Sequence, residues 1–342
     1  MKRHVLLPLL ALLAACGQDT PSDPVTAPVP NAALAVSSDK AFAYVTRFLM
    51  DSVSVIPTAT NTPVASIGVG DAPMGVAITP KADFAYVANQ GSAPGFGTVS
   101  VIETATNAVV ATVPVGSGPT RVAITPKGDF AYVTNLNANT VSVIRTATNT
   151  VVATIPVGLR PEGLAITPKG DLVYVVNIDS DSVSVIETSG NTVIATVPVG
   201  DNPIDVAITP KGDFAYVTNW VPGSVSVVRV VTNTVTATIP VGGPFHLAVT
   251  PNGDFVYVTQ LLTDAVAVIA TATNAIVATV PLGAQSGPGA VAFTPKGDVA
   301  YVTSIYDGTV SVIETAGHTV TSTVWAGESE GVAITPAKPK KR

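Results

Sequence analysis

The stretch that decides the fold reads VAITPKGD (122–129), FAYVTN (130–135), TVSVI (140–144) and TVVATI (150–155). All four runs are rich in β-branched residues, which are enriched in strands. Turn residues separate the runs. In TPKGD (125–129) proline fixes φ and glycine accepts positive φ, and TATN (146–149) separates the third run from the fourth. The stretch therefore predicts four consecutive strands of one antiparallel unit.

The same unit recurs along the chain, and a Tyr-Val pair is its most regular marker. This pair recurs every 41 to 46 residues, at Tyr44, Tyr86, Tyr132, Tyr174, Tyr216, Tyr257 and Tyr301. One such unit cannot bury both of its faces, so the units must stack around an axis, and we expect the tyrosines to pack between them. Four strands in a repeat of about 42 residues are typical of a β-propeller blade. We therefore predict an all-β, seven-bladed β-propeller with four antiparallel strands per blade, over residues 32–336.

The units carry a recognisable signature in their second strand. It reads YVTN at 132–135 and 216–219, YVAN at 86–89, YVVN at 174–177 and YVTQ at 257–260. These repeats resemble the YVTN-repeat β-propellers of bacterial periplasmic proteins and archaeal surface-layer proteins. The resemblance covers residues 32–335 and implies the propeller fold. It does not imply one function, because scaffolds of this type serve binding proteins and enzymes alike.

The composition excludes several classes of protein. Of 342 residues, 47% are hydrophobic and 12% are charged, which is the opposite of a disordered chain. No apolar run reaches the length of a membrane-spanning helix, so a polytopic membrane protein is excluded. A single cysteine excludes a disulfide scaffold and a thiolate metal cluster, and three histidines leave little room for a histidine-rich metal centre. We expect no cofactor.

The N-terminal segment, residues 1–15, has the layout of an export signal. A positively charged start (residues 2–4) precedes a short apolar stretch that ends in Leu-Ala-Ala-Cys at 13–16. This box resembles the bacterial lipoprotein signal, which implies that Cys16 is lipidated. The alternative is an ordinary signal cleaved near an Ala-x-Ala site. We expect a protein that is lipid-anchored to a bacterial membrane, faces the periplasm or cell surface, and has a flexible tether at 16–31.

Both ends of the repeat region carry a copy of the innermost strand. ALAVS at 33–37 and GVAIT at 331–335 are the two candidates to close the ring, and the sequence does not choose between them. The basic segment at 337–342 is expected to be a solvated tail. Because the net charge is −6 and the chain carries an export signal, we expect no nucleic-acid partner. We also expect a monomer.

Comparison of the seven copies separates two faces. The first-to-second and third-to-fourth turns share one face, here called the repetitive face, and are nearly invariant. The other connections share the opposite face, here called the variable face, and differ from copy to copy. Unique loops on rigid strands are where a binding site is expected. We predict a binding or protein-interaction scaffold that uses this acidic face for a protein, a peptide or a small polar ligand. Drift of unused loops is the alternative.

Residues that break the repeat are the candidate ligand contacts of the variable face. They are Arg47, Phe48, Phe96, Arg121, Arg160, Glu162, Asp205, Trp220, Phe245, His246 and Tyr306. Trp220 is either a binding aromatic or a residue that packs beneath the loops. Acidic residues outnumber arginines here, so the face should disfavour polyanionic partners. Asp179 and Asp181 are weak candidates for a calcium site, which needs several oxygen ligands in one loop.

One column of the repeat holds the candidate catalytic residues. The residue before the Val-Ala or Leu-Ala pair of each innermost strand is Ala33, Gly75, Arg121, Gly163, Asp205, His246, Ala290 or Gly331. Small residues are the rule in this column. Because innermost strands converge on the central channel, Arg121, Asp205 and His246 should surround its mouth. Glu162, one residue before Gly163, should lie between them.

These four residues raise an alternative function. A carboxylate at Asp205 would orient the His246 ring and raise its pKa, and Arg121 would hold an anion, which suits acid–base chemistry. Such an enzyme would resemble propeller lactonases or lyases in architecture. The other interpretation is a polar plug of the channel or a set of solvated rim residues, which we favour because no reactive nucleophile accompanies the histidine. A separation of Asp205 from His246 beyond about 6 Å would remove the basis for catalysis.

Overall fold

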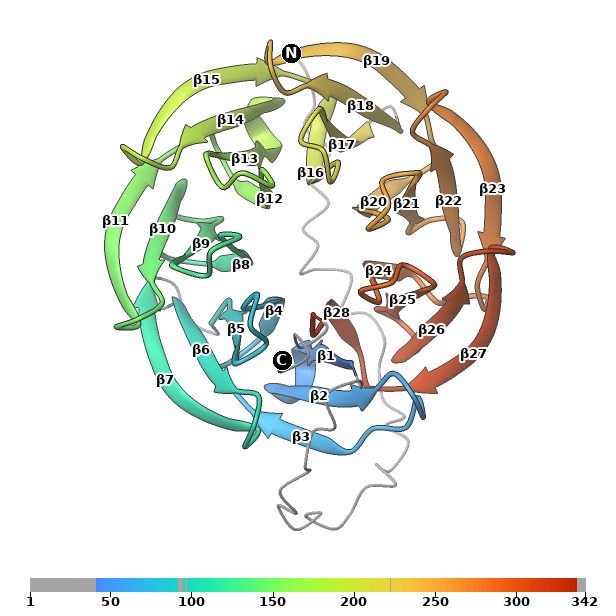
Figure 1. Cartoon of the computed structure of the whole chain (residues 1–342), viewed down its shortest axis with the longest axis horizontal. Coiled ribbons are helices and arrows are strands. Elements are labelled where there is room, and N and C mark those ends of the chain that lie inside the picture. The colour runs from blue at the N-terminus through green and yellow to red at the C-terminus, as the bar shows by residue number, and fades with distance from the viewer. Residues whose placement is uncertain (1–40, 92–94, 96, 222, 337–342) are drawn as a thin grey trace, which may run out of the picture. The chain divides into compact units, whose positions relative to one another are not determined.

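The computed structural model describes residues 41–336, except 92–94, 96 and 222. These residues form seven four-stranded antiparallel sheets arranged as blades around a common axis (Figure 1). The predicted seven-bladed, all-β propeller is therefore confirmed. The proposed signal, tether and basic tail, together with Cys16 and Phe96, lie outside the described residues.

The innermost strands stand around the axis of the ring, and each contacts the innermost strands of both neighbouring blades. Most of them begin at proline, which is tolerated at the first position of a strand because no ladder hydrogen bond is lost there. From the first blade to the seventh, the innermost strands are β28 (Ser329–Ile334), β4 (Pro73–Ile78), β8 (Pro119–Ile124), β12 (Pro161–Ile166), β16 (Asp201–Ile208), β20 (Pro244–Val249) and β24 (Pro288–Phe293).

The second and third strands of each blade form the buried layers, because blades cover both of their faces. The second strands are β1 (Phe42–Arg47), β5 (Phe84–Asn89), β9 (Phe130–Asn135), β13 (Leu172–Asn177), β17 (Phe214–Val221), β21 (Phe255–Gln260) and β25 (Val299–Ser304). The third strands are β2 (Ser52–Pro57), β6 (Gly97–Glu103), β10 (Thr140–Arg145), β14 (Ser182–Glu187), β18 (Ser224–Arg229), β22 (Ala265–Ala270) and β26 (Thr309–Glu314). Two 3-10 helices, η1 (Phe48–Met50) and η2 (Ile178–Ser180), connect them in two blades.

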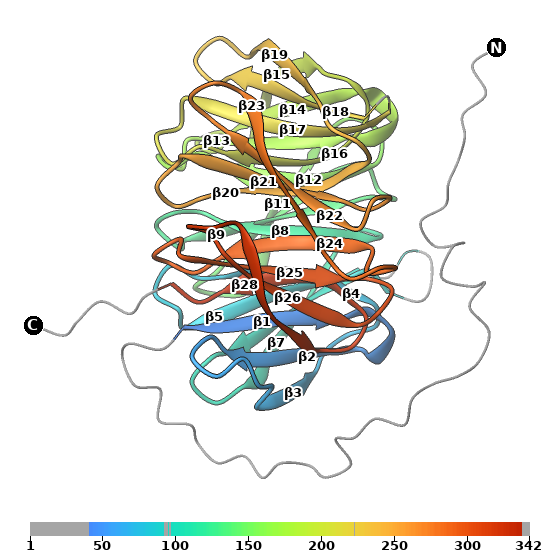
Figure 2. The ribbon, with the colours of Figure 1, turned by 90° about the vertical axis from the view of Figure 1, so that its right-hand side faces the viewer.

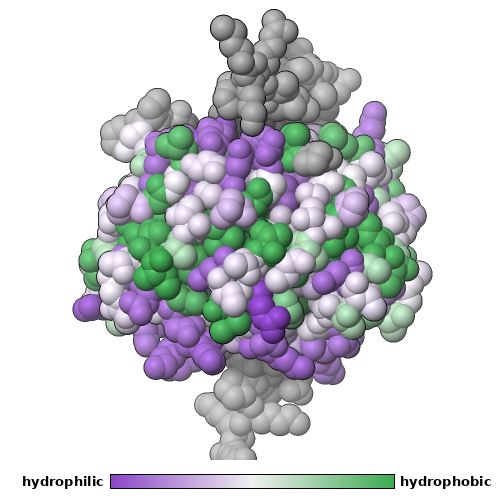
Figure 3. Space-filling model, turned by 90° about the horizontal axis from the view of Figure 1, so that it is seen from above, coloured by the Kyte–Doolittle hydropathy of each residue, from purple (hydrophilic) through white to green (hydrophobic). Residues whose placement is uncertain are grey.

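The outermost strands form the rim of the ring. They are β3 (Ala65–Gly68), β7 (Ala108–Val115), β11 (Thr150–Pro156), β15 (Thr192–Pro198), β19 (Thr234–Pro240), β23 (Ala275–Pro281) and β27 (Thr319–Trp325). Valine and isoleucine side chains of these strands are exposed, among them Val110, Ile194 and Val277. Figure 3 shows hydrophobic side chains gathered across the middle of one side of the ring, with polar side chains above and below. No helix among the described residues is both long and apolar enough to cross a membrane.

The C-terminal strand closes the ring. β28 pairs with β1, with Ala43 opposite Ile334, so the first blade contains strands from both ends of the repeat region (Figure 1). The Tyr301 hydroxyl donates to Asn61 and ties the seventh blade to the first. Of the two candidate strands, the copy at 331–335 therefore closes the ring. The competing copy at 33–37 lies outside the described residues.

The repeated tyrosines connect each blade to the next at the repetitive face. All seven are buried, as expected for packing between blades. The Tyr132 hydroxyl, for example, donates to Asn191 Oδ1 at 2.7 Å. Asn191 has φ +52°, a conformation that asparagine tolerates well, so it serves both its own turn and the neighbouring tyrosine. In the seventh blade His318 takes this role, because its Nδ1 lies 2.6 Å from the Tyr257 hydroxyl.

Candidate functional site

A bulge in every innermost strand sets the geometry of the channel mouth. In β8 the register shifts between Pro119 and Val122, so the strand carries one residue more than its partner β9. The shift recurs in all seven blades. The bulged residue of each strand belongs to the column that the sequence singles out. The bulge therefore places one residue from each blade at the same level of the ring.

The threonine of the YVTN signature fixes this bulge. The Arg121 N–H donates to Thr134 Oγ1 at 3.1 Å, and the Thr134 hydroxyl donates to the Glu162 carbonyl of the next blade at 2.7 Å. The same threonine position holds the backbone of Asp205 and of His246. Where the threonine is replaced by Ala88 or Val176, the bulged residue is glycine. The sequence analysis did not foresee this role of the threonines.

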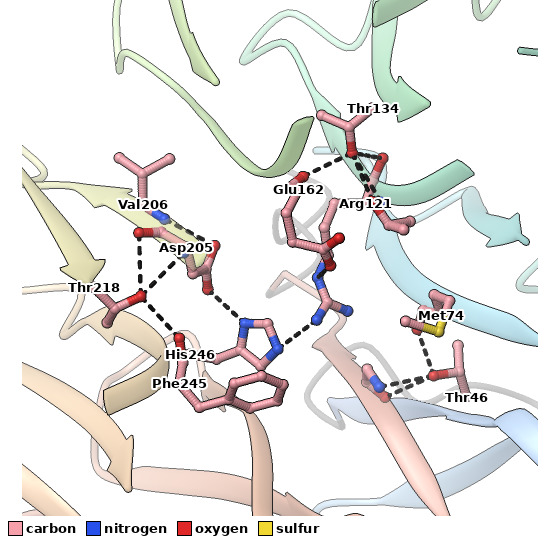
Figure 4. A network of polar contacts seen from close by, with 12 residues as sticks. Thr46, Met74, Arg121, Thr134, Glu162, Asp205, Val206, Thr218, Phe245 and His246 are labelled. Atoms are coloured by element: carbon pink, nitrogen blue, oxygen red, sulfur yellow. Dashed lines mark hydrogen bonds and ion pairs between the residues drawn. The ribbon is translucent and has the colours of Figure 1, made fainter. Parts of the chain in front are cut away.

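Four polar side chains meet across the mouth, and we call them the channel-mouth cluster: Arg121, Glu162, Asp205 and His246 (Figure 4). His246 Nδ1 lies 3.1 Å from Asp205 Oδ2, and His246 Nε2 lies 2.5 Å from Arg121 Nη2. Arg121 Nε lies 3.6 Å from Glu162 Oε1. The cluster contains one residue from each of β8, β12, β16 and β20. The structure thus brings together all four predicted candidates, well within the limit set for the Asp205–His246 pair.

The hydrogen bonds define the protonation state of His246. Arginine only donates, so His246 Nε2 accepts and the ring proton resides on Nδ1, from which it is donated to Asp205. The imidazole is therefore neutral. Burial, together with the charge of Arg121, lowers the pKa of His246 to about 4, although Asp205 acts in the opposite direction. Asp205 raises this pKa as expected, but the net shift is downward because burial of His246, which is only 2% exposed, outweighs it.

Glu162 and Asp205 occupy different environments within the cluster. Burial raises the pKa of Glu162 to about 7, while Arg121 and a hydrogen bond with Thr120 act against this shift. The Asp205 carboxylate is held by backbone groups as well as by His246. The Val206 N–H donates to Oδ1 at 2.9 Å and the Leu247 N–H donates to Oδ2 at 3.3 Å. Asp205 is therefore fixed in place on three sides.

Glycines make room for two members of the cluster, Asp205 and Arg121. A Cβ added to Gly163 would lie 2.4 Å from Asp205 Oδ1, and one added to Gly75 would lie 3.0 Å from the Cα of Arg121. Real Cβ atoms essentially never approach a neighbour as closely as the first of these distances. The small residues of the column are therefore needed where a neighbouring blade carries a large one.

Aromatic side chains flank the cluster on one side. The Phe245 ring lies 4.2 Å from the His246 ring, and Trp220 meets Phe245 edge-on at 6.2 Å. Phe245 is buried with Leu261 and Ile305, and the partly buried Trp220 packs against this group. Of the two roles considered for Trp220, the structure shows the packing role directly.

The remaining candidates lie farther from the channel axis. Arg47 is buried, donates to Ser66 and stacks on the Trp325 ring. Phe48 is half-buried and Tyr306 is exposed. The remaining arginine of the set, Arg160, pairs with Asp179 at 3.7 Å.

The two weak calcium candidates have other partners. Asp179 pairs with Arg160, and Asp181 accepts the Asn202 N–H at 2.9 Å. Within the described part of the chain, no three His, Cys, Asp or Glu side chains are grouped to hold a metal. An open groove beside Asp181, between Gly158 and Pro198, contains none of the channel-mouth cluster.

Glu330 is a mouth residue that the sequence analysis did not single out. It lies on β28 directly before Gly331, in the register that Glu162 occupies before Gly163. Burial raises the pKa of Glu330, and the charge of Arg121 opposes the shift. The matching Glu-Gly pairs in two copies of the repeat were the signal that could have identified it.

Known proteins agree with this architecture. The family model for YNCE-like beta-propellers matches residues 6–339. The chain belongs to this family. Membership accounts for the fold of this YNCE-like chain and supports the resemblance to YVTN-type propellers, but it does not separate a binding protein from an enzyme. No curated protein matches the chain.

Solved structures share the fold. A functionally unknown protein from Desulfotomaculum acetoxidans superposes with a TM-score of 0.76 at 21% identity, covering 86% of this chain and 99% of that one. A proposed 6-phosphogluconolactonase from Bacteroides uniformis gives 0.74 at 16% identity, with coverages of 86% and 99%. Hydrazine synthase from Kuenenia stuttgartiensis gives 0.65 at 23% identity, with coverages of 71% and 76%. At such identities the likeness shows the fold alone.

Proposed function

We propose that this chain is a non-catalytic binding propeller that holds a small polar ligand, or a segment of a protein or peptide partner, at the channel mouth of its variable face. One observation carries the proposal. Arg121, Asp205 and His246 occupy the column in which the other four blades carry only glycine or alanine, and Glu162 from a fourth blade meets them there. The repeat does not need these side chains in order to pack. Their convergence on rigid strands is what a preorganised site requires.

The state of His246 favours binding over catalysis. A general base needs a free lone pair within reach of the substrate proton, and both ring nitrogens of His246 already have partners. A pKa of about 4 also makes the imidazole a weak base near neutral pH. The cluster is therefore suited to holding a ligand by hydrogen bonds and charge.

A thermal-shift panel tests this proposal. The protein is screened against divalent ions, sugars, peptides and lactones, because a ligand that binds only the folded state raises the melting temperature. We expect one class to stabilise the wild type and Arg229→Gln, an exposed arginine far from the mouth, to the same extent, and to stabilise Arg121→Gln to a different extent. A ligand that stabilises Arg121→Gln as strongly as the wild type would contradict the assignment of the site.

We further propose that the propeller is exported and lipid-anchored through Cys16, with residues 16–31 as a flexible tether, and that it acts as a monomer without a nucleic-acid partner. The Leu-Ala-Ala-Cys box supports the anchor, and the net charge of −6 disfavours nucleic acid. Replacing Cys16 by serine should move the protein from the membrane fraction to the soluble fraction. Unchanged membrane association of Cys16→Ser would contradict the anchor.

A second candidate function is acid–base catalysis at the same cluster, on lactone or lyase substrates. The observation that favours it is Glu162, a buried carboxyl with a pKa of about 7 beside a guanidinium. Groups with such values exchange protons readily near neutral pH. Turnover of a lactone that is lost in Glu162→Gln, while the lactone still binds, would establish catalysis. A lactone that binds at the mouth and is never turned over would contradict this second function.

A further inference from the structure

The strand that closes the ring brings acidic groups to the channel mouth. Glu330 on β28 is only 5% exposed, and its Oε2 atom has no hydrogen-bond partner among the described residues. Glu328, two residues earlier, is half-buried and has one oxygen in the same condition. A buried carboxyl oxygen without a partner is costly, so these two atoms require an explanation.

Repeat packing does not explain Glu330. The equivalent positions of the other innermost strands hold one further acid and otherwise uncharged residues. They are Met74, Thr120, Glu162, Ile204, Phe245 and Gly289. A blade therefore closes equally well with an apolar side chain or with none. The acid at 330 is a feature of this site and not of the fold.

The charges at the mouth do not balance. Arg121 is the one cation that the described residues place in the mouth column, and it lies against Glu162 and His246. It also acts on Glu330 electrostatically, and Glu162 and Glu330 repel one another. One guanidinium thus serves two buried glutamates. A ligand with a positive charge would correct this imbalance, and an anionic ligand would increase it.

An accessible aromatic ring lies near Glu330. The Tyr306 side chain is 45% exposed, and burial together with the charge of Glu330 raises its pKa. The loop that carries it also touches Glu328, because a Cβ on Gly308 would lie 3.3 Å from the Glu328 nitrogen. A carboxylate beside an aromatic face is a combination that binds ammonium and guanidinium groups.

We propose that the ligand recognised at the channel mouth carries an organic cation, a primary ammonium or guanidinium group, which binds between Glu330, Glu328 and the Tyr306 ring. The inference rests on the proposed function and names the ligand class of the same site. The N–H donors of the cation supply the partners that the two glutamate oxygens lack. The rest of the ligand lies against the channel-mouth cluster.

Binding of such a cation is linked to protons. The charged and titratable groups around Glu330 and Glu328 are Arg121 from β8, Glu162 from β12 and Tyr306 from the seventh blade. Arg47 of β1, whose register partner on β28 is Ser329, is a further cation next to this segment. Burial raises the pKa values of Glu330 and Glu328. A bound cation favours their charged forms, so binding releases protons and the affinity rises with pH.

Calorimetry with cadaverine and methylguanidinium tests the proposal, with 1,5-pentanediol as the uncharged match of cadaverine. We expect the cations to bind the wild type with proton release and the diol not to bind. Glu330→Gln should weaken cation binding at least about tenfold, because removing one partner of a buried charge pair typically costs that much or more. Asp201→Asn, an exposed acid on the same face, should leave the affinity within about twofold, as for other exposed charges.

The results that would contradict the cation differ from those that would contradict the mouth as a binding site. Cations that bind Glu330→Gln and Glu328→Gln as tightly as the wild type, or that fail to bind the wild type at millimolar concentration, overturn the cation class. Should Glu330→Gln fail to fold, the half-exposed Glu328→Gln and Tyr306→Ala variants carry the test. A neutral sugar that binds in an Arg121-dependent manner would overturn the cation but keep the mouth as a site. Absence of any ligand whose affinity changes in Arg121→Gln or in Glu330→Gln would overturn the proposed function itself.

Discussion

The second strand of each blade has a different role at each of its two ends. Toward the repetitive face, all seven tyrosine hydroxyls contact the neighbouring blade in the same way, six at asparagine and one at His318. Toward the variable face, a threonine two residues later holds a bulged residue in five blades, and the side chain of that residue changes from blade to blade. Figure 2 shows the strands running between the two faces. The same strand thus joins the blades at one end and positions the candidate site at the other.

The largest effect is expected at the tyrosines. Tyr132→Ala removes a ring that is 1% exposed between two blades, and such truncations typically cost about 3–5 kcal/mol. Tyr132→Phe keeps the ring and loses only the hydrogen bond to Asn191, at about 1 kcal/mol. Urea denaturation measures both. Ligand binding by the surviving folded protein should not change. Equal losses for the two variants would show that the hydroxyl, and not the packing, holds the blades together.

A pH-dependent effect is expected at Glu162. Its pKa rises from an ordinary value of 4.5 to about 7 on folding, so the folded state binds the proton more tightly than the unfolded chain. The stability that this group contributes is therefore present below 4.5 and is lost as the pH rises toward 7.

Glu162→Gln removes this titration. Between pH 4.5 and pH 7 the variant should gain up to about 3 kcal/mol relative to the wild type, at 1.36 kcal/mol for each pKa unit. The lowered pKa of His246 has the opposite dependence, but it is present in both proteins and cancels in the comparison to first order. Denaturation curves at several pH values measure the difference. A constant offset would contradict the buried, protonated carboxyl.

A smaller effect is expected at Gly163, the glycine that makes room for Asp205 at the mouth. In Gly163→Ala the new Cβ meets Asp205 at 2.4 Å, so the neighbouring strand must shift. Overpacking of this kind typically costs about 1–3 kcal/mol. Gly68→Ala, which places its Cβ in open space, is the matched control. Gly163→Ala should also weaken ligand binding because it displaces Asp205 from His246. Full binding together with lost stability would separate the two roles.

Much of the fold was predictable because the sequence pattern of one blade recurs in all seven. The tyrosines and the TPKGD and TATN turns occur at fixed intervals, so each copy supports the assignment of the others. The channel-mouth cluster was predictable for the converse reason. Three of its members break one column of small residues, and Glu162 lies next to that column.

The other features of the site depend on contacts between distant parts of the chain, which the order of residues does not show. Glu330 and Arg121 meet only because the ring closes through β28, and the sequence left that closure open. The pKa of His246 follows from burial and from Arg121 on a blade three places away along the chain. The sequence indicates Asp205 as a neighbour of the histidine, but it does not show how completely both are enclosed.

One measurement tests the central claim, that the mouth departs from the repeat for binding and not for stability. The mouth is replaced by residues that the repeat itself uses there: Arg121→Ala, Glu162→Met, Asp205→Ala, His246→Ala and Glu330→Thr in one protein. Buried ionic groups seldom add net stability. We therefore predict an unfolding midpoint in urea at or above that of the wild type, with ligand binding lost. A loss of stability as large as that of Tyr132→Ala would show that the cluster is a structural plug.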